Sequence, residues 1–169
     1  MPSAKSLRKE FTSYLKSMDV VFSVSSRKEN IIYVGPLATQ SYYFNTGVFV
    51  YFQDDGRSSS AVQLRAAENV KLISTSVRDD VMQAISQQNE MGPFEFYLGD
   101  LNGIGAWVWE QVQPGSVGDQ LWGDIVFLTR EMESFLFDIE DMLDPDSYKA
   151  DLSSADQKAL EDAVNRMFP

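Results

Sequence analysis

The chain has 169 residues, of which 44% are hydrophobic and 12% aromatic, enough apolar material for one globular domain with a buried core. It contains no cysteine and no histidine, which excludes disulfides, thiol nucleophiles, thiolate or imidazole metal ligands and a histidine general base. Its net charge of −11 repels phosphate backbones, so nucleic acid is not an expected partner.

The N-terminal segment, residues 1–10, is charged and contains no apolar signal-peptide core. No apolar run in the chain approaches the roughly 20 residues of a membrane span. We therefore expect a soluble, cytoplasmic protein that does not associate with membranes and needs no cofactor.

The first part of the chain predicts a helix and then four strands. Apolar residues recur at helical spacing over residues 3–18. The apolar period then changes to two, which is typical of strands. The strands are expected at residues 20–25, 31–34, 48–52 and 62–66. The third of them is apolar on both faces, which places it inside the sheet rather than at an edge.

A second helix is predicted to begin at Ser76, because Ser76 and Asp79 fit a capping box. Gly92 and the proline that follows it end this helix. A hairpin comes next, with one strand at residues 94–98 and another at 104–112. The Asn-Gly pair between these runs is a strong hairpin signal.

The longest helix is predicted to begin at a similar box formed by Ser116 and Asp119 and to end near Leu143. Its expected length is roughly 40 Å. Its buried stripe is Leu121, Ile125, Leu128, Met132, Phe135, Ile139 and Met142. A short fourth helix is expected from about Ser153.

The order α-ββββ-α-ββ-α-α predicts the α+β class, with an antiparallel sheet of about five to six strands and helices packed on it. Residues 1–143 are expected to form the domain. Residues 144–169 are expected to be a C-terminal extension with a short helix that belongs to the same domain. No internal repeat or interdomain linker is visible.

Aromatic residues supply the candidate binding surface. Trp107 and Trp109 point to the same face of their strand, opposite Ala106 and Val108. Two interpretations are open: the tryptophans fill the core beneath the long helix, or they line a surface where an apolar segment docks. The candidate protein-binding or dimer surface consists of Trp107, Trp109, Trp122, Phe49 and Tyr51.

No catalytic constellation is visible. The glycines between Gly99 and Gly105 join two strands, so they offer no helix N-terminus to a phosphate. Carboxylates could pair for hydrolysis, but most lie on predicted exposed helix faces, and nothing in the sequence places two across a cleft. We therefore expect no enzyme activity and no catalytic, cofactor-binding or metal-binding residue.

Charge is distributed unevenly along the chain. Bases gather in the first helix, at Lys5, Arg8, Lys9 and Lys16, whereas acids dominate from Glu131 onward. Either the two ends attract each other, within a monomer or across a dimer, or both are solvated helix faces.

From Ser74 to Leu143 the chain shows a helix ending in Gln87–Glu90, a phenylalanine-rich strand, an Asn/Asp turn, a strand and a long acidic amphipathic helix. This order resembles the YbjN family. The resemblance implies a secretion-chaperone-like fold, whose members include small acidic, often dimeric chaperones and bacterial regulators of sensory transduction. The loop from Gly35 to Gly47 is longer than in the family, and the tail helix after Asp144 is additional.

We expect the protein to act as a non-enzymatic protein-binding module, chaperone-like or regulatory. We expect it to form a homodimer and to bind a further protein partner. Binding would bury apolar side chains on a sheet or helix surface, or would add a strand at a sheet edge. Two alternatives stay open. One is a small-molecule-binding or carboxylate-based enzymatic domain, and the other is a structural subunit of a larger assembly.

Overall fold

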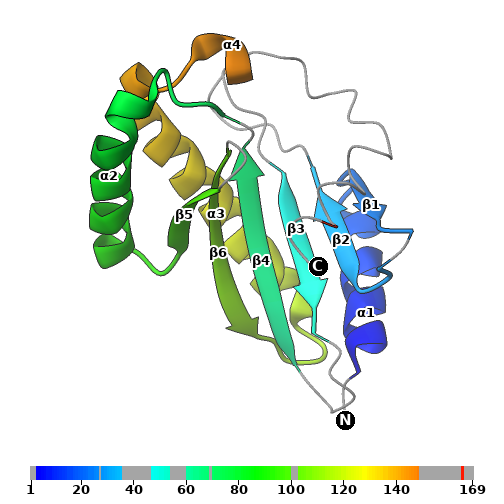
Figure 1. Cartoon of the computed structure of the whole chain (residues 1–169). Helices are drawn as coiled ribbons and strands as arrows, with labels where there is room; N and C mark the ends of the chain where they lie inside the picture. The colour runs from blue at the N-terminus through cyan, green and yellow to red at the C-terminus, as the bar shows by residue number, and fades with distance from the viewer. Residues whose placement is uncertain are drawn as a thin grey trace.

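A computed structural model describes residues 3–26, 28–35, 47–53, 60–68, 70–99, 103–148 and 165. Within these residues, six strands form one antiparallel sheet in the order β1-β2-β3-β4-β6-β5 (Figure 1). The strands are β1 (Phe22–Val24), β2 (Ile31–Val34), β3 (Val48–Phe52), β4 (Ala61–Glu68), β5 (Glu95–Gly99) and β6 (Gly103–Gln111).

Helices pack on this sheet, which confirms the predicted α+β class. They are α1 (Ala4–Ser17), α2 (Arg78–Met91), α3 (Val117–Asp138) and the short α4 (Pro145–Tyr148). Figure 1 shows α1 and α3 on one face of the sheet and α2 beside β5 at one end of it. The fourth helix predicted from Ser153 lies outside the described residues, and no described helix is long and apolar enough to cross a membrane.

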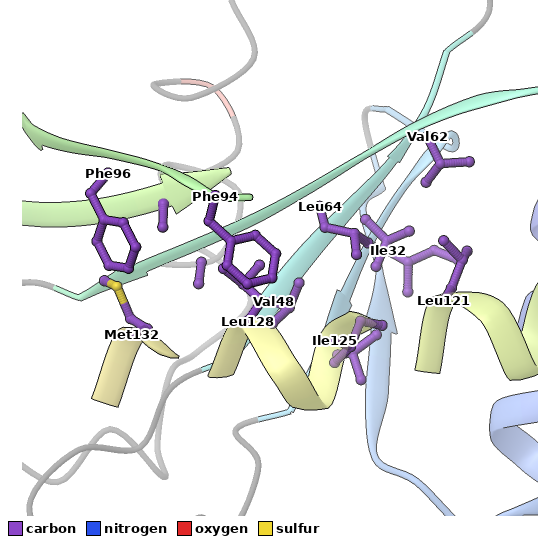
Figure 2. Close-up of a cluster of buried hydrophobic side chains, with 14 of the residues drawn as sticks. Ile32, Val48, Val62, Leu64, Phe94, Phe96, Leu121, Ile125, Leu128 and Met132 are labelled. Carbon is purple, nitrogen blue, oxygen red and sulfur yellow. The ribbon is translucent and has the colours of Figure 1, made fainter. Parts of the chain in front are cut away.

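The core lies between the sheet and the pair α1 and α3. Even-numbered residues of β4 and β6 face the helices. Leu64 belongs to the core cluster, and Val108 opposite it is partly buried and packs against that cluster. Figure 2 shows the α3 side chains Ile125, Leu128 and Met132 pointing toward the sheet. The predicted α3 stripe is confirmed, since its residues are buried up to Ile139 and the last of them, Met142, is partly buried.

The structure corrects the predicted end of α3. The helix has 22 residues, about 33 Å, and ends at Asp138 rather than near Leu143. The following backbone is used for other contacts. Leu143 forms a β-bridge with Leu72, and the Asp144 amide donates to the Lys71 carbonyl at 2.8 Å. These bonds hold the segment after α3 out of the helix.

Both predicted capping boxes are wrong. At α2 the hydroxyl of Ser76 pairs with that of Ser74, and the N-cap position belongs to Val77. At α3 the Ser116 hydroxyl caps no helix amide and donates instead to the carbonyl of Gln113. A serine can bond to the preceding turn as easily as to the helix that follows it.

The start of α3 is capped by a residue from another helix. The Glu10 carboxylate of α1 accepts hydrogen bonds from the Gly115 amide at 2.8 Å and the Val117 amide at 3.0 Å. One turn further along α1, the Tyr14 hydroxyl donates to Asp119 at 3.1 Å. A carboxylate at a helix N-terminus is stabilised by the helix dipole, so this contact joins α1 and α3 electrostatically as well as sterically.

Tyrosine rings lie directly against glycines at several places in the described structure. The pairs are Tyr14 with Gly118, Tyr33 with Gly47, and Tyr97 with Gly105. A side chain at Gly118 would overlap the Tyr14 ring, because α1 crosses close to α3 there. The missing Cβ therefore sets how near the two helices approach.

A side-chain amide covers the outer edge of β5. Asn89, near the end of α2, accepts a hydrogen bond from the Phe96 amide at 2.7 Å and donates to the Phe96 carbonyl at 3.1 Å. This reciprocal pair is the one that a neighbouring antiparallel strand would make. Asn89 therefore takes the place of a further strand at this residue.

We expect Asn89→Ala to lower the free energy of unfolding by about 1–2 kcal/mol, because two hydrogen bonds are lost and α2 is released from β5. Urea denaturation followed by circular dichroism measures the change. Asn89→Asp is the matched variant, since it keeps the acceptor but cannot donate to the Phe96 carbonyl, and it should be destabilised as well. Wild-type stability in both variants would contradict this role of Asn89.

Candidate functional site

The predicted aromatic residues of the sheet lie on the face opposite α1 and α3. The register aligns Phe49, Arg65 and Trp107 in one row across β3, β4 and β6. It aligns Tyr51, Gln63 and Trp109 in the next row. We call the side chains of this surface the far face: Tyr33, Phe49, Tyr51, Gln63, Arg65, Tyr97, Trp107 and Trp109.

The interpretation that the two tryptophans fill the core beneath the long helix is wrong. Buried Ala106 and partly buried Val108 occupy the positions of β6 that belong to the core. Trp107 and Trp109 alternate with them and so point away from α3. The choice between these faces depends on which side of the sheet the helices cover, and the alternation of residues alone does not decide it.

Exposure divides the far face into an accessible and an inaccessible part. Trp109 is 43% exposed, and its ring meets that of Tyr51 edge-on with centroids 6.2 Å apart. Phe49 is only 5% exposed, and its ring centroid lies 4.9 Å from that of Tyr33. A partner could therefore reach Trp109, whereas Phe49 is covered.

Polar groups lie between these aromatics. Arg65 lies over the Tyr97 ring, 5.8 Å from its centroid, which is within range of a cation–π contact. Burial raises the pKa of Tyr33 to about 12, and the charge of Glu68 adds to the effect. Burial also raises the pKa of Tyr97, although the charge of Arg65 opposes this. Both phenols are neutral near pH 7. Charged side chains on this face of the sheet come from Arg65 and from Glu95, which lies opposite Trp107 in the register of β5 and β6.

Trp122 belongs to the other layer of the molecule. It lies on α3 and packs, partly buried, against the core. The five predicted aromatic residues therefore do not form one surface. Phe49, Tyr51, Trp107 and Trp109 lie on the far face, and Trp122 lies on the helical side.

Two exposed phenylalanines on α3 were missed by the sequence reasoning. Phe127 is 44% exposed and packs against Phe94 at 5.2 Å, and Phe137 is 59% exposed. Both residues lie outside the buried stripe of α3. That position was a usable signal, because an aromatic residue on the outer side of an amphipathic helix cannot enter the core. They expose apolar surface at two separate places on α3, in the layer opposite the far face.

The structure also pairs two carboxyl groups that the sequence did not bring together. Glu110 ends the helix-facing row of β6 and is hydrogen-bonded to Asp124 of α3. Burial raises the pKa of Glu110, and the charge of Asp124 and the bond to it raise it further. Burial raises the pKa of Asp124, while the bond from Glu110 lowers it. The contact between these two carboxyl groups joins the sheet to α3.

We expect Glu110→Gln to raise the melting temperature near neutral pH. The pKa of Glu110 is raised in the folded state above its ordinary 4.5, so the folded protein holds this proton more tightly than the unfolded chain. The associated stability is present below pH 4.5 and is lost as the pH rises through the folded pKa. The advantage of the glutamine should therefore disappear on acidification.

Differential scanning calorimetry at pH values from neutral down to below pH 4.5 measures the melting temperatures of both proteins. Glu95→Gln, at an exposed position of β5, is the control, because it removes a carboxyl group from the sheet and leaves the contact between Glu110 and Asp124 in place. A Glu110→Gln variant that melts below the wild type near neutral pH would contradict the proton-sharing arrangement.

Taken together, the chain is an α+β protein with an antiparallel sheet, helices on one face and an aromatic surface on the other. Neither the models of known protein families nor the curated proteins include a match to it. Among the described residues, no group of three or more acidic side chains is placed to hold a metal ion.

Proposed function

We propose that this protein is a non-enzymatic protein-binding module of the cytoplasm, chaperone-like or regulatory, that forms a homodimer. The observation that carries the proposal is the exposure of Trp109, 43%, beside Tyr51 and Trp107 on the far face. The pattern shared with the YbjN family supports the same assignment.

The chemistry of this area suits a protein partner. Burying a large apolar side chain contributes about 1.5–3 kcal/mol, and tryptophan, tyrosine and arginine are the residues that most often dominate interfaces. The far face combines all three types, with Arg65 between Phe49 and Trp107 in one row. The net charge of −11 would favour neutral or basic partners at this surface through electrostatic steering.

A photocrosslinking experiment tests this function. A benzophenone amino acid is placed at position 109, with exposed Gln113 as the control position, and the protein is irradiated in lysate of the source organism. We expect a discrete crosslinked product from position 109 that excess unlabelled wild-type protein competes away and excess Trp109→Ala does not. Identical products from positions 109 and 113, or competition by both proteins alike, would contradict the proposal.

A further inference from the structure

The two edges of the sheet differ in what covers them. At the β5 edge, α2 lies alongside and Asn89 bonds to both backbone groups of Phe96 (Figure 1). At the opposite end of the sheet the outermost strand is β1, and Figure 1 shows no labelled helix beyond it. Within the described residues no strand pairs with this edge, and an unpaired edge is a template for another strand.

The backbone bonds of β1 show which of its groups point outward. The carbonyl of Val21 and the amide of Ser25 both bond to the β2 side, at 3.0 and 3.1 Å. Bonded positions alternate along an antiparallel ladder, so the N–H and C=O groups of Phe22 and Val24 point away from the sheet. They form no backbone hydrogen bond to any residue within the described ranges.

The sequence of β1 also lacks the residue types that usually block strand addition. Residues 20–24 contain no charged residue and no proline. Val21, whose side chain lies on the same side as the far face, is 71% exposed. A strand added here would meet an apolar side chain on that side.

On the other side of the edge lies α1, and its charge indicates the partner. The helix buries Leu7 and Phe11 in the core and turns Glu10 toward α3. Successive residues are about 100° apart, so the side of α1 away from α3 carries Lys5, Arg8, Thr12 and Lys16. Figure 1 places α1 at the β1 end of the sheet, and from this and the helical spacing we infer that these bases lie toward the β1 edge. They form a basic strip in a protein whose net charge is −11.

We propose that the β1 edge binds an extended segment of a partner protein in which apolar and acidic residues alternate. The segment adds to the six-stranded sheet as one more strand and bonds to the outward groups of Phe22 and Val24. Its apolar side chains face Val21, and its carboxylates face Arg8 and Lys5. This inference rests on the proposed function, because it takes a protein as the partner, and it names the site and the chemistry of the bound segment.

The probe is a short fluorescein-labelled peptide of alternating valine and glutamate, with the valine–lysine peptide as its matched control. Fluorescence anisotropy at low salt should show the glutamate peptide binding at least about tenfold more tightly, and added salt should reduce the difference. Arg8→Glu should reverse or abolish this preference. Equal binding of both peptides, or no binding of either, would overturn the proposal.

A backbone variant locates the peptide. Val24→Pro removes an outward N–H, and edge strands accept proline where that group faces solvent. We expect it to weaken binding of the glutamate peptide at least about tenfold while the circular dichroism spectrum is retained. In the wild type, bound peptide should slow hydrogen exchange at Phe22 and Val24, which tests the site even if the proline variant misfolds. Unchanged exchange at both amides would overturn the proposal.

Two results separate this site from the far face and from self-association. Trp109 lies on β6, four strands from β1 and roughly 19 Å away, so Trp109→Ala should leave peptide binding unchanged. Peptide binding without a crosslink at position 109 would refute the surface assigned under the proposed function and support the edge site. If the wild type were a dimer that Val24→Pro converted to a monomer, a second copy would occupy the edge and the acidic-segment proposal would fall.

Discussion

Replacing Gly118 with alanine is expected to lower the free energy of unfolding by about 1–3 kcal/mol, the usual cost of overpacking. The new methyl group would overlap the Tyr14 ring where α1 crosses α3. Relief of that overlap would push the helices apart and lengthen the bonds from Glu10 to the start of α3. Urea denaturation measures the loss, and Tyr14→Ala in the same background should recover part of it.

Gly123 provides the matched control, because it lies in the same helix and a methyl group at that position would meet no neighbouring atom within 4 Å. Gly123→Ala should stabilise the protein by roughly 0.5–1 kcal/mol through its higher helix propensity alone. Two identical substitutions five positions apart are therefore expected to have opposite signs. Equal effects at both positions would show that the close contact with Tyr14 does not limit the packing of the helices.

The second large effect is expected at Leu128, which is fully buried between α3 and the sheet (Figure 2). Leu128→Ala should cost about 2–5 kcal/mol, because the lost transfer free energy is increased by the cavity left behind. The same denaturation experiment measures it. A loss below about 1 kcal/mol would indicate that the layer between α3 and the sheet is loosely packed.

The preceding residue supplies the comparison for Leu128. Phe127 is larger but 44% exposed, and its ring packs against that of Phe94. Phe127→Ala should therefore cost no more than about 1 kcal/mol. A cost as large as that of Leu128→Ala would place Phe127 in the core, and its exposed ring would then no longer indicate a contact surface.

The helices and strands could be predicted from the spacing of apolar residues, because that spacing depends on residues close together in the chain. Leu121, Ile125 and Leu128 recur at helical spacing because one side of α3 faces the sheet, so their burial could be predicted from sequence. The capping of α3 could not be predicted in this way. Glu10 lies 107 positions from Val117, and only the folded arrangement brings its carboxylate to that amide.

The candidate site, too, could be predicted only in part from the sequence. Alternation correctly placed Trp107 and Trp109 together, but it gave no information on which side the helices would cover. The small side chain of Ala106 fits the covered side and is the local signal for it. The contact between Glu110 and Asp124 joins a strand to a helix and follows no spacing rule, so sequence reasoning could not find it.

Asn89 has a consequence for how copies of this protein can associate. A filament would need the β1 edge of one molecule to join the β5 edge of the next, and so on without end. Asn89 and α2 obstruct the β5 edge, so that head-to-tail join is blocked. Edge-to-edge contact between two β1 strands uses up both open edges, which limits any such assembly to a closed pair and protects the protein against fibrous polymerisation.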